Sequence, residues 1–111
     1  MELKIVKSDM GATHIALSGK LDVQGEGEIG ELFRNLVDSR NTSFLVDMSQ
    51  VTYLASLGIR LLFAAAKTLA ADGKKVIVVS PQPMVEETLL NSGTAKLIPI
   101  ARNEAEALTL L

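Results

Sequence analysis

Apolar residues in this chain recur at two spacings that alternate along the sequence, and this alternation limits the folds open to it. Leu3 and Ile5, then Ile15 and Leu17, recur at every second position, which is typical of β-strands. From about Glu26 the apolar residues instead lie three and four positions apart, as on one face of a helix: Ile29, Leu32, Phe33, Leu36 and Val37. Such switching predicts helices packed against a sheet.

The remaining apolar segments continue the alternation. Met10-Gly11 suits a hairpin turn between the first two strands, and Gly19 is expected to end the second strand. We then predict a strand over Phe44–Val46 ending at Asp47, a connection over 49–56, and a helix from Ser56 to Gly73. A strand over Val76–Val79 and a helix closed by Gly93 should follow. The chain is expected to end with a strand over Leu97–Ile100 and a last helix capped by Asn103 with Glu106.

The resulting order is β-β-α-β-α-β-α-β-α. It predicts an α/β fold, a two-layer sandwich in which a mixed β-sheet carries four helices on at least one face. A length of 111 residues suits one domain spanning 1–111. With 48% hydrophobic but only 4% aromatic residues, its core must be aliphatic.

Composition excludes several classes of function. Cysteine is absent, which removes disulfide scaffolds, thiolate metal sites and thiol chemistry. No signal peptide is visible, and no apolar stretch is long enough to span a bilayer, so we expect a cytoplasmic protein without direct membrane insertion. A net charge of −2 without a basic cluster argues against nucleic-acid binding.

Little in the sequence supports catalysis. The only histidine, His14, lies on a predicted strand and is expected to be exposed, and one imidazole without an acidic neighbour makes a poor catalytic centre. The glycines of segment 25–30 lack the spacing and the preceding strand of a phosphate-binding loop. Asp22 and Asp47 both end predicted strands, where ligands often bind, but Asp47 alone is a weak metal candidate. We therefore expect no enzyme, metal or required cofactor.

Two segments that are far apart in the sequence share the register of a known pattern. In the segment 44–62, a hydrophobic strand ending in Asp47 leads to Val51-x-Tyr53-Leu54, then to Ser56-x-Gly58 and an apolar helix. Earlier, the segment 18–22 reads Ser-Gly-Lys-Leu-Asp, like a G-x-[LI]-D loop. On these motifs the whole chain resembles the STAS domain, typified by anti-sigma factor antagonists.

The resemblance implies a partner switch. In that family the unphosphorylated domain binds an anti-sigma factor, commonly a serine kinase of the histidine-kinase-like type that uses ATP, and so frees a sigma factor. Phosphorylation of a serine in the turn weakens binding, and a PP2C-type phosphatase restores it. A phosphate adds a charge of about −1.5 to −2. A helix N-terminus tolerates that charge through its free N–H groups and its dipole.

The chain departs from the family pattern within the turn. Ala55 stands where the family has an aspartate, and Leu57 stands where it has the usual phosphoacceptor. Ser56 is thus the only hydroxyl residue of the turn. Two interpretations follow: Ser56 is the phosphorylation site, shifted by one position, or it is only the N-cap of the helix.

The predicted partner-binding residues each have a structural alternative. Leu57 either contacts a partner or packs inward as the first residue of the helical stripe, and Gly58 permits a close backbone approach in both cases. Arg60 opposes the helix dipole, so it either faces an acidic partner or phosphate or is simply solvated. Asp22, on a predicted exposed loop, either contacts the partner or is solvated; Ser56 completes the set.

We therefore expect an anti-sigma factor antagonist controlled by phosphorylation at Ser56. The alternative is a STAS adaptor subunit of a membrane complex of the ABC lipid-transport type, without a phosphoswitch, and the loss of the aspartate and the acceptor favours it modestly. A small-molecule sensor would need an apolar cavity, whereas the alanines of segment 64–71 indicate close helix packing.

Overall fold

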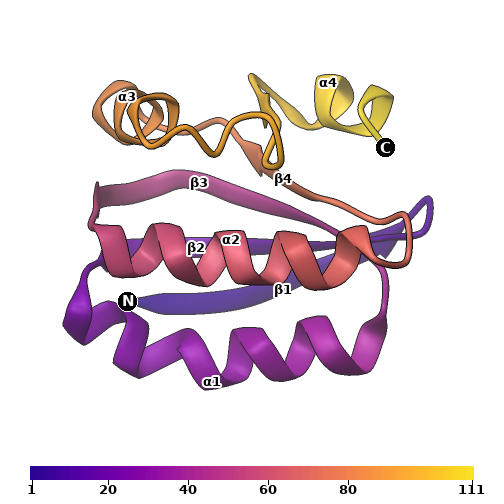
Figure 1. Ribbon diagram of the computed structural model, residues 1–111, viewed down its shortest axis with the longest axis horizontal. Coiled ribbons are helices and arrows are strands. Elements are labelled where there is room, and N and C mark those ends of the chain that lie inside the picture. The colour runs from indigo at the N-terminus through magenta and orange to yellow at the C-terminus, as the bar shows by residue number, and fades with distance from the viewer.

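Five strands and four helices follow one another in the predicted order in the computed structural model, which describes residues 1–111. The elements are β1 (Glu2–Asp9), β2 (Ala12–Leu21), α1 (Val23–Arg40), β3 (Ser43–Leu54), α2 (Ser56–Ala70), β4 (Val76–Val79), α3 (Pro83–Asn91), β5 (Ile100–Ala101) and α4 (Glu104–Thr109). Figure 1 shows how they are arranged.

The strands form one mixed sheet with the spatial order β1-β2-β3-β4-β5. β1 and β2 pair antiparallel, and their hairpin turn places Met10 and Gly11 at positive φ values of 52° and 77°, as a tight hairpin requires. All later pairs are parallel. Parallel strands need crossover connections, which α1, α2 and α3 supply.

One face of the sheet carries the main core. Alternate strand residues such as Ile15, Phe44 and Val78 pack there against apolar side chains of α1, α2 and α3. Phe33 of α1 meets Phe44 edge-on, with ring centroids 6.2 Å apart. In Figure 1, α2 crosses in front of β2, with β3 above it and α1 alongside it below. The core is aliphatic apart from this aromatic pair, as the composition predicts.

The opposite face of the sheet is only partly covered. Leu45, Ile77 and Val79 point to that side and form a smaller cluster with Ala107 of α4. The helices therefore lie on both faces, three on one side and the short α4 on the other. The predicted mixed sheet with four helices is confirmed, and α4 is the element that buries part of its second face.

Two strands extend further than the sequence pattern predicts. β3 continues to Leu54 instead of ending at Asp47, so the expected connection over 49–56 is wrong. β2 likewise continues past Gly19 to Leu21. Irregular register between these two strands, near Ser18 and Gly19, breaks the alternation on which the prediction depended.

Helix and strand ends account for the other differences. α1 begins at Val23 rather than near Glu26, because its early glycines have low helix propensity and mask the start. β5 has two residues, Ile100–Ala101, instead of four. Asn103 caps α4 as predicted, accepting the amide of Glu106 at 2.8 Å, but the Glu106 carboxylate accepts the Arg102 amide instead of closing a capping box.

Candidate functional site

The turn between β3 and α2 is tied to the end of β2 by main-chain contacts. Ala55 is extended, with φ −97° and ψ 168°, and is the N-cap of α2. Its amide donates to the carbonyl of Leu21 at 3.0 Å, and its own carbonyl accepts the amides of Gly58 and Ile59 at 3.0 and 3.1 Å. The start of α2 is therefore fixed to the strand that precedes Asp22.

Gly58 makes this attachment close. A Cβ atom at Gly58 would lie 2.6 Å from Cγ of Leu21 and 2.9 Å from the Leu21 carbonyl oxygen. Any larger residue would have to push the helix away from β2. The close backbone approach predicted for Gly58 is thus present, and its immediate cause is packing against Leu21.

Ser56 is the first residue of α2 and is exposed. It is not the N-cap: that position belongs to Ala55, whose methyl side chain makes no capping hydrogen bond. The interpretation of Ser56 as a capping residue is therefore wrong. Because the first amides of a helix have no intrahelical acceptor, those of Ser56 and Leu57 remain available near the exposed hydroxyl.

Leu57 is half-exposed and lies outside the core cluster, so the expectation that it packs inward is wrong. The buried stripe of α2 instead begins at Gly58 and repeats at three- and four-residue spacing: Gly58, Leu61, Leu62, Ala65, Ala66 and Leu69. Close contact between Gly58 and Leu21 sets the rotation of the helix, and this rotation leaves Leu57 at the margin.

Arg60 is exposed one helical turn after Ser56, and it forms no ion pair. α2 contains no acidic residue that could hold its guanidinium group. Residues four apart on a helix are neighbours on its surface. Ser56 and Arg60 thus share a face of α2.

Asp22 has a structural role that the sequence prediction did not assign. Expected on an exposed loop, it is instead the half-buried N-cap of α1, and its Oδ1 accepts the amide of Gly25 at 2.8 Å. It directly follows Leu21, which holds both Ala55 and Gly58. The fold therefore brings the Asp22 segment to the start of α2, although the carboxylate is engaged by its own helix.

His14 is buried, with 5% of its surface exposed, so the expected exposed position is wrong. Its Nδ1 lies 3.3 Å from Oε1 of Glu104 in α4, and Lys7 of β1 donates to the other carboxylate oxygen at 3.0 Å. Lys7 is the main reason that the pKa of Glu104 lies below its usual value. Nothing local in the sequence indicated that Glu104 of α4 would reach this histidine.

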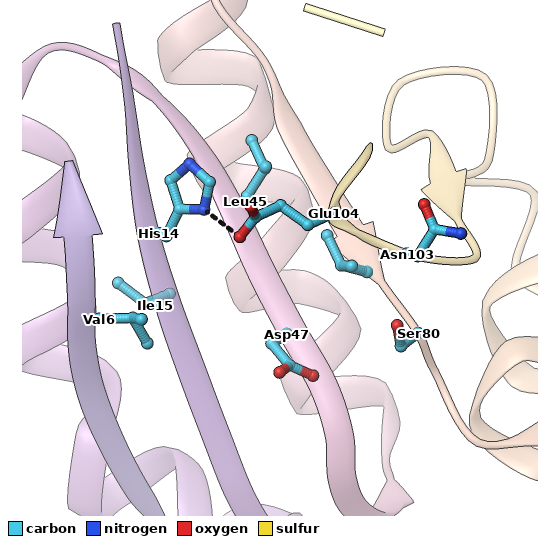
Figure 2. A pocket seen from close by; sticks show the side chains of 9 residues that line it. Val6, His14, Ile15, Leu45, Asp47, Ser80, Asn103 and Glu104 are labelled. Atoms are coloured by element: carbon cyan, nitrogen blue, oxygen red, sulfur yellow. Dashed lines mark ion pairs between the residues drawn. The ribbon is translucent and has the colours of Figure 1, made fainter. Parts of the chain in front are cut away.

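A pocket of about 170 Å³ opens beside this ion pair (Figure 2). Its polar groups are largely engaged within the protein: Asp47 accepts the amide of Ser49 at 2.9 Å, and Ser80 donates to a main-chain carbonyl. The unpartnered Nε2 of His14 points away from Asp47 in Figure 2. No three acidic or histidine side chains converge to hold a metal ion. This pocket lies at the boundary where the start of α4 packs against the sheet.

Comparison with known proteins assigns the chain to a family. The sequence model of the STAS domain family matches residues 4–107, so the chain belongs to that family. No helix is both long enough and apolar enough to span a membrane.

Solved structures share the fold. An anti-sigma-factor antagonist (STAS) domain protein from Planctomyces limnophilus is 18% identical, with a TM-score of 0.83 and coverage of 97% of this chain and 96% of that one. An anti-sigma factor antagonist from Mycobacterium paratuberculosis is 22% identical, with a TM-score of 0.82 and coverage of 98% and 93%. The Bacillus cell fate determinant SpoIIAA in its phosphorylated form is 18% identical, with a TM-score of 0.73 and 98% coverage of both chains.

Proposed function

We propose that this chain is an anti-sigma factor antagonist of a partner-switching pathway, controlled by phosphorylation of Ser56. The observation that carries the proposal is the position of Ser56, the only hydroxyl residue of the turn, exposed at the first position of α2. Membership of the STAS family and the likeness to antagonists, one of them solved in a phosphorylated form, support it.

The start of α2 suits a phosphoserine for physical reasons. A phosphate there gains free amides and the positive end of the helix dipole. No acidic residue of α2 opposes it, and Arg60 lies one turn away. The fold can therefore keep its stability while the surface gains a charge of about −1.5 to −2.

The same surface offers the partner contact. Leu57 is half-exposed beside Ser56, and Gly58 keeps the turn close to the Asp22 segment. We assign Asp22, Ser56, Leu57, Gly58 and Arg60 to the partner-binding surface. Asp22 belongs to it through the placement of its segment, and the buried Gly58 belongs to it because it keeps the turn close to that segment. A phosphate beside Leu57 would place a strongly hydrated charge in an apolar contact, which weakens binding.

The partner in this proposal is an anti-sigma factor that is itself a serine kinase of the histidine-kinase-like ATPase type, and a PP2C-type phosphatase reverses the modification. The chain acts in the cytoplasm, where ATP is available to that kinase. It is a binding module that needs no cofactor of its own, and neither nucleic acid nor the membrane is its target.

Incubation with the cognate serine kinase and ATP tests the modification. Intact-mass analysis should show one added phosphate on the wild type and on Thr52→Ala, whose hydroxyl is also exposed nearby. Ser56→Ala should remain unmodified. A phosphate that persists at full level on Ser56→Ala would remove Ser56 as the acceptor.

A second candidate function is that of a STAS adaptor in a membrane complex of the ABC lipid-transport type, without a phosphoswitch. The half-exposed Leu57, at the position where the family carries its usual acceptor, favours this candidate. Neighbouring genes distinguish the two functions: a kinase and a PP2C-type phosphatase for the switch, or a permease and an ATPase for the adaptor.

A further inference from the structure

A groove runs along the outer side of α2, and the residues that follow α3 border it on the other side. Its volume is about 570 Å³. Ile59, Phe63 and Ala64 supply apolar walls, and the segment 92–94 forms the opposite rim. In Figure 1, α2 lies at the front of the molecule and no other element crosses it.

The lining residues of α2 form a stripe that continues the proposed phosphorylation site. Ser56, Arg60, Phe63 and Lys67 are spaced four, three and four residues apart, which places them on one side of a helix. At 1.5 Å per residue this stripe is about 16 Å long, or three helical turns. One elongated surface thus extends from Ser56 along α2.

The charge of this stripe has one sign. Arg60 and Lys67 are both exposed, neither forms an ion pair, and the groove contains no carboxylate. The ammonium group of Lys67 lies 5.8 Å from the ring centroid of Phe63, beside the apolar floor. The hydroxyl groups of the rim are already engaged, because those of Ser92 and Thr94 hydrogen-bond to each other at 2.8 Å. In a chain of net charge −2, this face of α2 is locally basic.

We propose that this groove binds an acidic amphipathic helix of a partner protein. The half-buried Ile59 and Phe63 match an apolar face, and Arg60 and Lys67 match carboxylates on its flank. Two cations are too few for a lipid surface, which typically uses clusters of four to eight. The groove does not depend on phosphorylation. One part rests on the proposed function: a phosphate on Ser56 would repel the acidic helix of the partner.

A pair of synthetic helical peptides tests the groove directly. Both carry the same apolar face over three turns; one has glutamate and the other lysine at the flanking positions. Titration into the isotope-labelled chain, followed by amide NMR shifts, should perturb Ile59–Lys67 and Ser92–Thr94 with the glutamate peptide only. Arg60→Glu/Lys67→Glu should weaken that binding about tenfold or more, equal to about 1.4 kcal/mol. Lys4→Glu/Arg102→Glu, a matched reversal of exposed charges elsewhere, should leave it unchanged.

The outcomes separate the groove from the phosphoswitch. The unmodified wild-type chain should bind the glutamate peptide even if no kinase ever modifies it, so failure of the phosphoswitch leaves the groove standing. The inference is overturned if millimolar glutamate peptide shifts no groove amide, if the lysine peptide binds equally well, or if only vesicles of phosphatidylcholine and phosphatidylglycerol shift these amides. Self-association through the same residues, seen as shifts that depend on the concentration of the chain alone, would overturn it too.

Discussion

Gly58 of α2 packs against Leu21 of β2 so closely that a Cβ atom at Gly58 would lie 2.6 Å from the leucine Cγ. The same leucine accepts a main-chain hydrogen bond from Ala55 at 3.0 Å. One residue at the end of β2 therefore sets both the position and the rotation of α2. The exposure of Ser56 and Leu57 follows from this contact.

The first prediction concerns Gly58→Ala. Within a helix this change ordinarily stabilises by about 0.5–1 kcal/mol. Here the added methyl group meets Leu21, including its carbonyl oxygen at 2.9 Å, so we expect a net loss of about 1–3 kcal/mol of unfolding free energy. Gly27→Ala is the matched control, since its Cβ would meet open space within α1 and should stabilise the protein. Urea unfolding measures both, and equal effects would contradict the close contact.

The second prediction concerns the cap of α1. Asp22→Ala removes the acceptor for the Gly25 amide and should lower the unfolding free energy by about 0.5–2 kcal/mol. Asp22→Asn keeps a capping oxygen and should lose much less. If Asp22 instead acts mainly in partner binding, both variants would unfold like the wild type in urea while binding the partner more weakly.

The third prediction concerns pH. Lys7 holds the pKa of Glu104 below its usual value of 4.5, so the folded state prefers the ionised carboxylate. Glu104 should therefore stabilise the fold above pH 4.5, and this contribution should be lost as the pH falls through the lowered pKa. Wild type and Glu104→Gln should differ in unfolding free energy at neutral pH and converge in acid. Glu87→Gln, an exposed carboxylate outside the ion pairs, serves as the control. A difference that grew on acidification would contradict the role of this pair.

The alternation of apolar spacing predicted the order of the elements because each element buries apolar residues in one of the two clusters on either side of the sheet. Strand ends were harder to predict. β3 runs on to Leu54 because Met48 and Val51 still reach the core, while irregular pairing with β2 shifts the polar residues between them. A periodic pattern cannot register such an irregularity without knowledge of the neighbouring strand.

The position of the turn around Ser56 was predictable, but the structural roles of the nearby side chains were not. The turn around Ser56 follows from the local motif, whereas Asp22 became a cap because α1 starts earlier than its glycines suggest. The prediction that His14 is exposed was wrong for a different reason. Its burial depends on α4, which lies 90 residues further along the chain at Glu104. Long-range covering of this kind leaves no local signal in the sequence.

Affinity for the cognate anti-sigma factor, measured by titration calorimetry, tests the central claim most directly. The unmodified chain, the chain phosphorylated by the kinase, and Ser56→Ala carried through the same reaction should be compared. We expect the phosphorylated chain to bind at least about tenfold more weakly, a loss of about 1.4 kcal/mol, with Ser56→Ala binding like the unmodified chain. Equal affinity of the phosphorylated and unmodified chains would contradict the switch at Ser56.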